Sequence, residues 1–337
     1  MKIAFLVLNH RPPAQLARLV SALRSQLPDS PVVVHHDVFG AEPPGSLLEP
    51  IGGVHLLISG RRAAWGDFSI VDIYCWSLTW MTEHLEFDWV ILLSAQDYPI
   101  KPLAGLAECL TRNGADALLH AVPVTRLADA AARRDMRRRY LYQYRPPADP
   151  RGAGAAGGDL RRAVRLGAGR MLDAVNLLQP CFKIYRLPDG MAYRTGRRAR
   201  RTPFGPGRPC WHGSMWFSLS RRAADYVLGY LSDQPEYVEY YRHTIIPDES
   251  MLATVLHNSR DLRVDDRDVH YTRWTHAKSG HPDTFGAGDL TELLAAPEYF
   301  ARKFDIRTDA LILDRLDEVI GGGAACGGSR RCPARSG

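Results

Sequence analysis

The chain has 337 residues, of which 45% are hydrophobic and 24% are charged. These values are near the average of folded globular proteins, so a disordered or fibrous chain is excluded. The 43 Lys and Arg residues against 37 Asp and Glu residues give a formal net charge of +6, and most of the cations are arginines. Because arginine suits bidentate contacts with phosphate, the composition allows an anionic ligand without demonstrating one.

The opening segment, MKIAFLVLNHRPP, contains an apolar run of six residues from Ile3 to Leu8. A membrane helix needs about 20 such residues, and the core of a signal peptide about 7–15. We therefore expect a first buried strand and a cytoplasmic protein, while peripheral contact with a membrane stays open. The six cysteines include no C-x-x-C pair, so neither a zinc site nor a disulfide framework is predicted.

Short apolar runs alternate with helical patterns along the chain. The runs predict strands at 2–8, 31–37, 54–59, 89–94 and 117–122, and the intervening patterns predict helices at 14–27 and 69–85. Strands that alternate with helices indicate an α/β fold with a mainly parallel, Rossmann-like sheet flanked by helices. We expect a single domain over residues 1–320, with its ligands beyond the carboxyl ends of the strands.

Two stretches and the tail depart from this pattern. Residues 133–170 and 194–209 are rich in Arg, Gly and Pro and are expected to be basic loops. Arginine-rich stretches are usually solvated surface, and no recognisable nucleic-acid module accompanies them, so no nucleic-acid partner is predicted. Residues 321–337 lack the apolar side chains needed to fold and are expected to be disordered.

Carboxylates follow two of the expected strands. Asp37 ends the run VVVHHD, and Asp97 follows WVILLS in the segment LLSAQDYPIKP. Either residue alone could simply cap a turn. Two carboxylates at equivalent strand ends favour a ligand site at that edge of the sheet.

A third acidic residue, Glu249, lies in IIPDESMLATVLHNS. Pro247 and Asp248 predict a helix start there, which would place Glu249 in the first turn, where the helix dipole favours its ionised form. An ionised carboxylate is the state that a general base requires. Complementing the dipole is the simpler alternative role for this residue.

The segment YFARKFD, residues 299–305, places Arg302 and Lys303 between two phenylalanines. As a helix it would bury Phe300 and Phe304 on one face, with Lys303 beside them and Arg302 nearly opposite. Covering apolar surface with cationic stems is the alternative use of these two residues. The lone D-x-D of the chain, Asp266 and Asp268, lies in a polar turn without a preceding apolar strand, so we expect no metal site there.

Six motifs in order resemble glycosyltransferase family 14, which contains the core-2/I-branching N-acetylglucosaminyltransferases and the peptide O-xylosyltransferases. They are WGDFSIVDIYCWSL, LLSAQDYPIKP, HGSMWFSLSRRAADYVL, IPDESMLATVLHNS, FGAGDLTELL and FARKFD. The resemblance implies a GT-A fold and inverting transfer of N-acetylglucosamine or xylose from a UDP-sugar to a hydroxyl of a glycan or peptide. It also implies catalysis without a metal ion or other cofactor.

The same resemblance implies roles for six residues. Glu249 is the base, Lys303 and Arg302 stabilise the charge on the departing UDP, and Asp37 contacts the uridine. Asp97 borders the donor sugar and, with Trp216 of the GSMWF motif, the acceptor.

Two departures leave both donor and acceptor open. The arginine expected in core-2 enzymes is replaced by Gly280, with Lys278 and His281 nearby, and the aspartate of the xylosyltransferases is replaced by Met215. The second phosphate cation is then Arg302 or Lys278. The alternatives are a catalytically idle glycan-binding relative and, from a different class, a basic nucleic-acid-binding protein.

Overall fold

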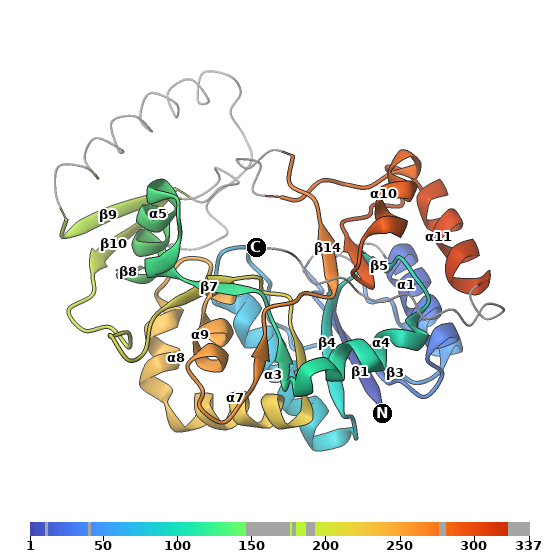
Figure 1. The fold of residues 1–337 in the computed structure, drawn as a ribbon, viewed down its shortest axis with the longest axis horizontal. Coiled ribbons are helices and arrows are strands. Elements are labelled where there is room, and N and C mark those ends of the chain that lie inside the picture. The colour runs from blue at the N-terminus through green and yellow to red at the C-terminus, as the bar shows by residue number, and fades with distance from the viewer. Residues whose placement is uncertain are drawn as a thin grey trace.

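A computed structural model describes residues 1–10, 13–39, 42–145, 176, 180–186, 193–275 and 281–322. A seven-stranded sheet forms its centre, in the order β13-β6-β12-β4-β1-β2-β3 (Figure 1). The strands are β1 (Ile3–Asn9), β2 (Val32–His36), β3 (Val54–Leu57), β4 (Trp89–Ser94), β6 (Ala117–Leu118), β12 (Ser218–Ser220) and β13 (Val264–Asp265). β1 to β4 run parallel to one another, and β12 is antiparallel to its neighbours β4 and β6. The predicted mainly parallel α/β sheet is confirmed.

Helices cover both faces of this sheet because its central strands are apolar on both sides. Along β1, Ile3, Phe5 and Val7 face one core and Ala4 and Leu6 face the other. The first core includes α1 (Pro13–Gln26) and α11 (Leu311–Gly322), together with α4 (Leu106–Thr111) and α10 (Leu290–Ala295). The second includes α3 (Ser69–His84), α7 (Arg221–Asp233), α8 (Pro235–Arg242) and α9 (Met251–His257). The short helix α2 (Gly45–Leu48) contributes Leu48 to the first core.

A smaller lobe combines a three-stranded sheet, β8-β10-β9, with helix α5 (Figure 1). Its elements are α5 (Ala130–Tyr140), β8 (Tyr142–Tyr144), β9 (Phe182–Arg186) and β10 (Tyr193–Arg198). The prediction of basic loops is therefore wrong for residues 133–144 and 194–198, while 146–170 lies outside the described residues. Asp129 caps α5 by accepting from the amides of Ala131 and Ala132, and Met136 and Tyr140 bury one face of the helix.

The segment predicted as a helix at 299–305 is instead the strand β15 (Phe300–Arg302) and the residues after it. β15 pairs in parallel with β14 (His270–Thr272) and antiparallel with β5 (Asp97–Pro99). Phe300 and Ala301 are successive and both fully buried, which a strand between two partners permits. Tertiary pairing has overridden the local helical spacing.

Two smaller differences concern the other predicted segments. The run at 117–122 divides into β6 and β7 (Ala121–Pro123), and β7 pairs with β11 (Trp211–Gly213) in a separate two-stranded sheet. α11 continues to Gly322, so the expectation of a disordered tail is wrong for residues 321 and 322, and residues 323–337 lie outside the described part. None of the helices described here is both long and apolar enough to cross a membrane.

Candidate active site

A cleft of about 1400 Å³ opens beyond the carboxyl ends of β1, β2 and β4. Asn9, Asp37 and Ser94 line it from these strand ends. Asp248, Glu249, Trp216, Arg302 and Lys303 line it from later parts of the chain. Five of the six residues singled out in the sequence therefore reach one cleft, at the edge of the sheet where it was expected. Asp97 does not line it.

Asp37 stabilises the loop that follows β3 through hydrogen bonds. Its two carboxylate oxygens accept the amides of Phe39 and Ala63, each at 2.9 Å. Both oxygens keep a further lone pair, because a carboxylate can accept about four hydrogen bonds. The residue thus fixes one end of the cleft and can still accept a bond from a ligand.

Asp97 lies behind the cleft wall, and its side chain is 0% exposed. One oxygen accepts the amide of Ser94, and the other accepts Nε of Arg302 at 3.0 Å across the β5–β15 pair. The guanidinium of Arg302 also lies over the ring of Trp216, 4.0 Å from its centroid. Arg302 is therefore held both by its ion pair with Asp97 and by its cation–π contact with Trp216.

Lys303 follows Arg302 directly and also lines the cleft. Its amide donates to the carbonyl of Asp283, and its carbonyl accepts the amide of Phe285. The backbone is thus anchored on both sides of the residue. Two adjacent cationic residues therefore line the cleft.

Glu249 ends a single 3₁₀ turn, Pro247–Glu249, and Ser250 separates this turn from α9. The expected capping of a helix by Asp248 is therefore wrong, since the turn has no side-chain cap. Ile246 precedes the turn with a left-handed backbone, φ 51° and ψ 57°, which is uncommon for a β-branched residue. The amide of Ile246 donates to the carbonyl of Gly66, and that bond helps to hold the conformation.

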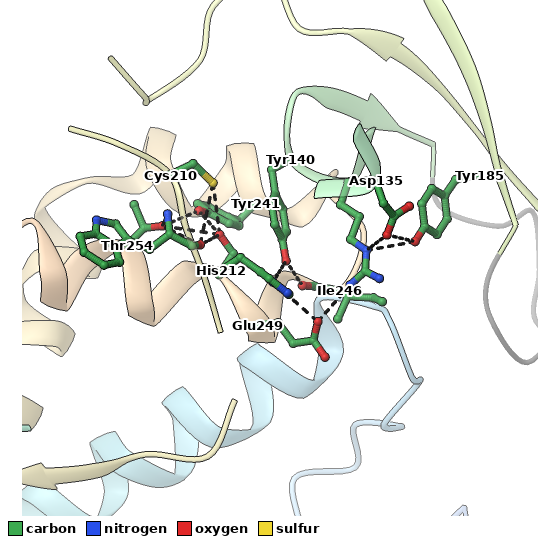
Figure 2. A network of polar contacts seen from close by, with 12 residues as sticks. Asp135, Tyr140, Tyr185, Cys210, His212, Tyr241, Ile246, Glu249 and Thr254 are labelled. Carbon is green, nitrogen blue, oxygen red and sulfur yellow. Dashed lines mark hydrogen bonds and ion pairs between the residues drawn. The ribbon is translucent and has the colours of Figure 1, made fainter. Parts of the chain in front are cut away.

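Arg139 of α5 is the partner of Glu249, and Figure 2 shows the network around this pair. Nη1 of Arg139 lies 3.0 Å from Oε2 of Glu249, and Nε donates to Asp135 and to the hydroxyl of Tyr185. The side chains of Arg139 and Glu249 are 14% and 33% exposed. The ion pair therefore lies at the border between the core and the cleft.

His212 approaches the same carboxylate from β11. Its Nδ1 lies 3.9 Å from Oε2 of Glu249 and 3.2 Å from the hydroxyl of Tyr140. That hydroxyl also donates to the carbonyl of Ile246. The strained turn, β11 and α5 are thus tied together around Glu249.

Burial dominates the electrostatics of this site. It raises the pKa of Glu249, and the charge and hydrogen bond of Arg139 oppose that rise. Burial and the neighbouring Glu249 raise the pKa of Asp248 to about 7. Burial and Arg139 lower the pKa of His212 to about 3, so the imidazole is neutral near pH 7. An ion pair, rather than the expected helix dipole, favours the charged form of Glu249.

A second set of hydroxyls holds α9 against β11, also in Figure 2. Ser250 donates to the carbonyl of Trp211 at 2.6 Å, and the hydroxyl of Tyr241 lies 2.9 Å from Ser250 and 3.2 Å from Thr254. Cys210 lies 3.5 Å from Ser250. β11, which carries His212, is therefore held against α9 and against Ser250, the residue that follows Glu249.

Sequence reasoning missed Arg139, Tyr140 and His212. The signal for the first two was the segment D-A-A-A-R-R-D-M-R-R-R-Y, in which Asp129 is a good N-cap and Met136 and Tyr140 lie one turn apart. His212 begins the motif HGSMWFSLSRRAADYVL, but nothing in that motif indicated that it approaches Glu249.

The D-x-D also differs from expectation, since β13 precedes it and Asp266 and Asp268 line the cleft. Asp266 pairs with His120, and Asp268 pairs with His270. Within the described ranges, no group of three or more His, Cys, Asp or Glu residues is arranged to hold a metal ion. The positions of Lys278 and Gly280 lie outside those ranges.

Comparison with known proteins gives a family match. The Core-2/I-Branching enzyme family model matches residues 189–295. Beta-glucuronosyltransferase GlcAT14A of Arabidopsis thaliana is 31% identical over 129 residues, which is 37% of this chain and 28% of that protein. Xylosyltransferase 1 of Canis lupus familiaris is 26% identical over 352 residues, which is 97% of this chain and 31% of that protein. The chain thus spans about a third or less of the length of these relatives.

A solved structure of S. aureus TarS 1–349 in complex with UDP-GlcNAc aligns over 35% of this chain and 34% of its own. The identity is 14% and the TM-score is 0.24. A likeness this weak carries no argument about this chain.

Proposed function

Because the chain belongs to the Core-2/I-Branching enzyme family, we propose that it is an inverting, metal-independent glycosyltransferase. It moves N-acetylglucosamine or xylose from a UDP-sugar to a hydroxyl of a glycan or peptide. The observation that carries this proposal is the pairing of Glu249 with Arg139 on a cleft that Arg302 and Lys303 also line. A carboxylate poised as a base and two cations for a leaving diphosphate are the groups that such a transfer needs.

In the proposed reaction, Glu249 takes the proton of the acceptor hydroxyl as its oxygen attacks the anomeric carbon of the donor. The new carbon–oxygen bond forms on the face opposite the phosphate. The bond from the anomeric carbon to the phosphate oxygen breaks, and its electron pair leaves with UDP. The anomeric configuration is therefore inverted.

The other predicted residues bind and orient the substrates. Lys303 and Arg302 stabilise the negative charge that develops on UDP, and Asp37 accepts a hydrogen bond from the nucleoside. Trp216 contributes an aromatic wall for the acceptor. Asp97 acts through Arg302 rather than by contact, since its side chain is fully buried.

The alternative function is glycan binding without catalysis, by an idle relative of the same family. Both Glu249 and Lys303 are present, and both line the cleft. A protein that only binds glycans would have no need of a half-buried carboxylate paired with an arginine at the cleft. The transferase is therefore the better-supported proposal.

A donor screen tests this function. The purified chain is incubated with UDP-N-acetylglucosamine, UDP-xylose, UDP-glucuronic acid and GDP-mannose, and both thermal stabilisation and release of the nucleotide are measured. UDP-glucuronic acid is included because one relative is a glucuronosyltransferase. The proposal predicts stabilisation by UDP and slow hydrolysis of one UDP-sugar. Stabilisation without turnover of any UDP-sugar, even with an acceptor, would favour the idle relative.

Chelation tests the absence of a catalytic metal. Because two cationic side chains replace the ion in this proposal, EDTA in large excess over trace metal should leave the initial rate of UDP-sugar turnover unchanged. Dialysed enzyme with added manganese is the control. A rate that EDTA abolishes and manganese restores would show that a carboxylate of the cleft holds an ion.

A further inference from the structure

The lobe formed by α5 and the β8-β10-β9 sheet carries a dense positive charge. Seven arginines and two aspartates lie at 126–145, and six arginines with no acidic residue lie at 193–208. The two stretches meet, since β8 pairs with β10 and the amide of Arg145 donates to the carbonyl of Thr195. The charge is therefore concentrated in one lobe rather than spread over the surface.

The two aspartates of this lobe already have partners. Asp129 caps α5, and Asp135 binds Arg139. Four of the thirteen arginine side chains also have partners. Arg133 donates to backbone carbonyls, Arg139 binds Glu249, Arg194 binds Asp67, and Arg208 lies over two tyrosine rings.

Nine arginines of the lobe remain. Among the residues that the structure describes, their guanidinium groups have no hydrogen bond and no ion pair within 4 Å, and all but Arg138 are exposed. They are Arg126, Arg134, Arg137, Arg138, Arg145, Arg197, Arg198, Arg200 and Arg201, called here the arginine surface. Guanidinium groups without protein partners can bind carboxylate, sulfate or phosphate oxygens in pairs.

The arginine surface and the candidate active site share helix α5. α5 carries Arg134 and Arg137 and, on another face of the helix, the Arg139 that binds Glu249. Eleven residues of helix span about 16 Å, the length of a few sugar units. A chain of a few sugar units that passes around α5 would thus bring a hydroxyl within reach of Glu249.

From this arrangement we propose that the acceptor is an acidic glycan, a polysaccharide with carboxylate or sulfate groups, which the arginine surface holds while one of its hydroxyls faces Glu249. The inference rests on the proposed transferase function. A membrane partner is not favoured, because none of the exposed large hydrophobic residues of the described chain lies in this lobe. A nucleic acid would satisfy the charge but would not explain why the charge lies on the helix that holds Glu249.

Binding of polygalacturonate, a chain of uronic acids, tests the proposal directly. Neutral dextran and poly-U RNA are the comparison ligands, and each dissociation constant is measured at low and at moderate salt. Two double variants remove adjacent charges from the arginine surface, Arg134→Gln with Arg137→Gln and Arg197→Gln with Arg198→Gln. The matched control, Arg260→Gln with Arg315→Gln, removes the same charge from exposed arginines elsewhere.

We expect polygalacturonate to bind, dextran not to bind, and affinity to fall with salt. Each double variant of the arginine surface should weaken polygalacturonate binding about tenfold. The control variant should weaken it less than about twofold. UDP affinity should be the same in all four proteins. Equal loss in the control, or tighter binding of poly-U than of polygalacturonate, would overturn the proposal. Polygalacturonate binding without UDP binding would instead contradict the transferase function and leave the arginine surface as an anion-binding site.

Discussion

At the scale of single residues, Arg139 favours the ionised form of Glu249 against the effect of burial. Burial raises the pKa of Glu249, and Arg139 is the largest opposing influence. A base must be deprotonated, so the acidic limb of the profile of kcat/KM against pH reports this pKa. Arg139→Met should move that limb to higher pH, because the opposing charge is gone. Arg139→Lys, which keeps the charge, should move it less. A limb that stays in place in both variants would assign it to another group.

Lys303 and Arg302 are expected to differ, at the same scale, in how much each contributes to catalysis. Arg302 is committed to Asp97 and Trp216, whereas the sequence resemblance singles out the lysine for the diphosphate. We expect Lys303→Ala to lower kcat/KM by at least about 10²-fold, and Arg302→Ala by less. Lys303→Arg should recover only part of the lost kcat/KM, because the planar guanidinium of arginine does not have the shape of the compact ammonium group of lysine. Near-wild-type kinetics for Lys303→Ala would remove Lys303 from the proposed mechanism.

At the scale of elements, the Asp97–Arg302 pair joins β5 to β15. Arg302→Ala leaves a fully buried carboxylate without its cation, which typically costs about 3–5 kcal/mol of folding free energy. Arg307→Ala is the control, because that arginine is 61% exposed and pairs with Asp305, and exposed pairs contribute about 0–1 kcal/mol. Urea unfolding of both variants measures the difference. Equal midpoints would show that Asp97 is not held as a buried ion by Arg302.

The same elements show where sequence reasoning succeeds and where it fails. β1, β2 and β4 were predictable because an uninterrupted apolar run buried on both faces leaves few alternatives. β15 was not, since Phe300 and Phe304 have helical spacing and the strand exists only through pairing with segments about 30 and 200 residues away. Likewise, the arginine-rich segment of α5 was interpreted as a loop, although Asp129 caps the helix and Met136 and Tyr140 form its buried face.

At the scale of the whole molecule, the α/β architecture and the edge of the sheet that carries the cleft followed from alternating strands and helices. The residues of the candidate site could be predicted from the sequence only in part. Asp37, Glu249 and Lys303 could be named from strand ends and motifs, but Arg139 and His212 reach Glu249 from separate elements, α5 and β11. A single sequence carries no local pattern for such long-range contacts.

In the proposed UDP-sugar transferase, catalysis by the whole molecule depends on Glu249 as the base. Glu249→Gln keeps the shape of the side chain but cannot accept the proton. Measured with the UDP-sugar that the wild type turns over, it should lower kcat by roughly 10²–10⁴-fold, while the dissociation constant of UDP stays close to that of the wild type. A Gln variant with near-wild-type kcat would contradict the account and would point to another base, with the neighbouring Asp248 as the residue to test.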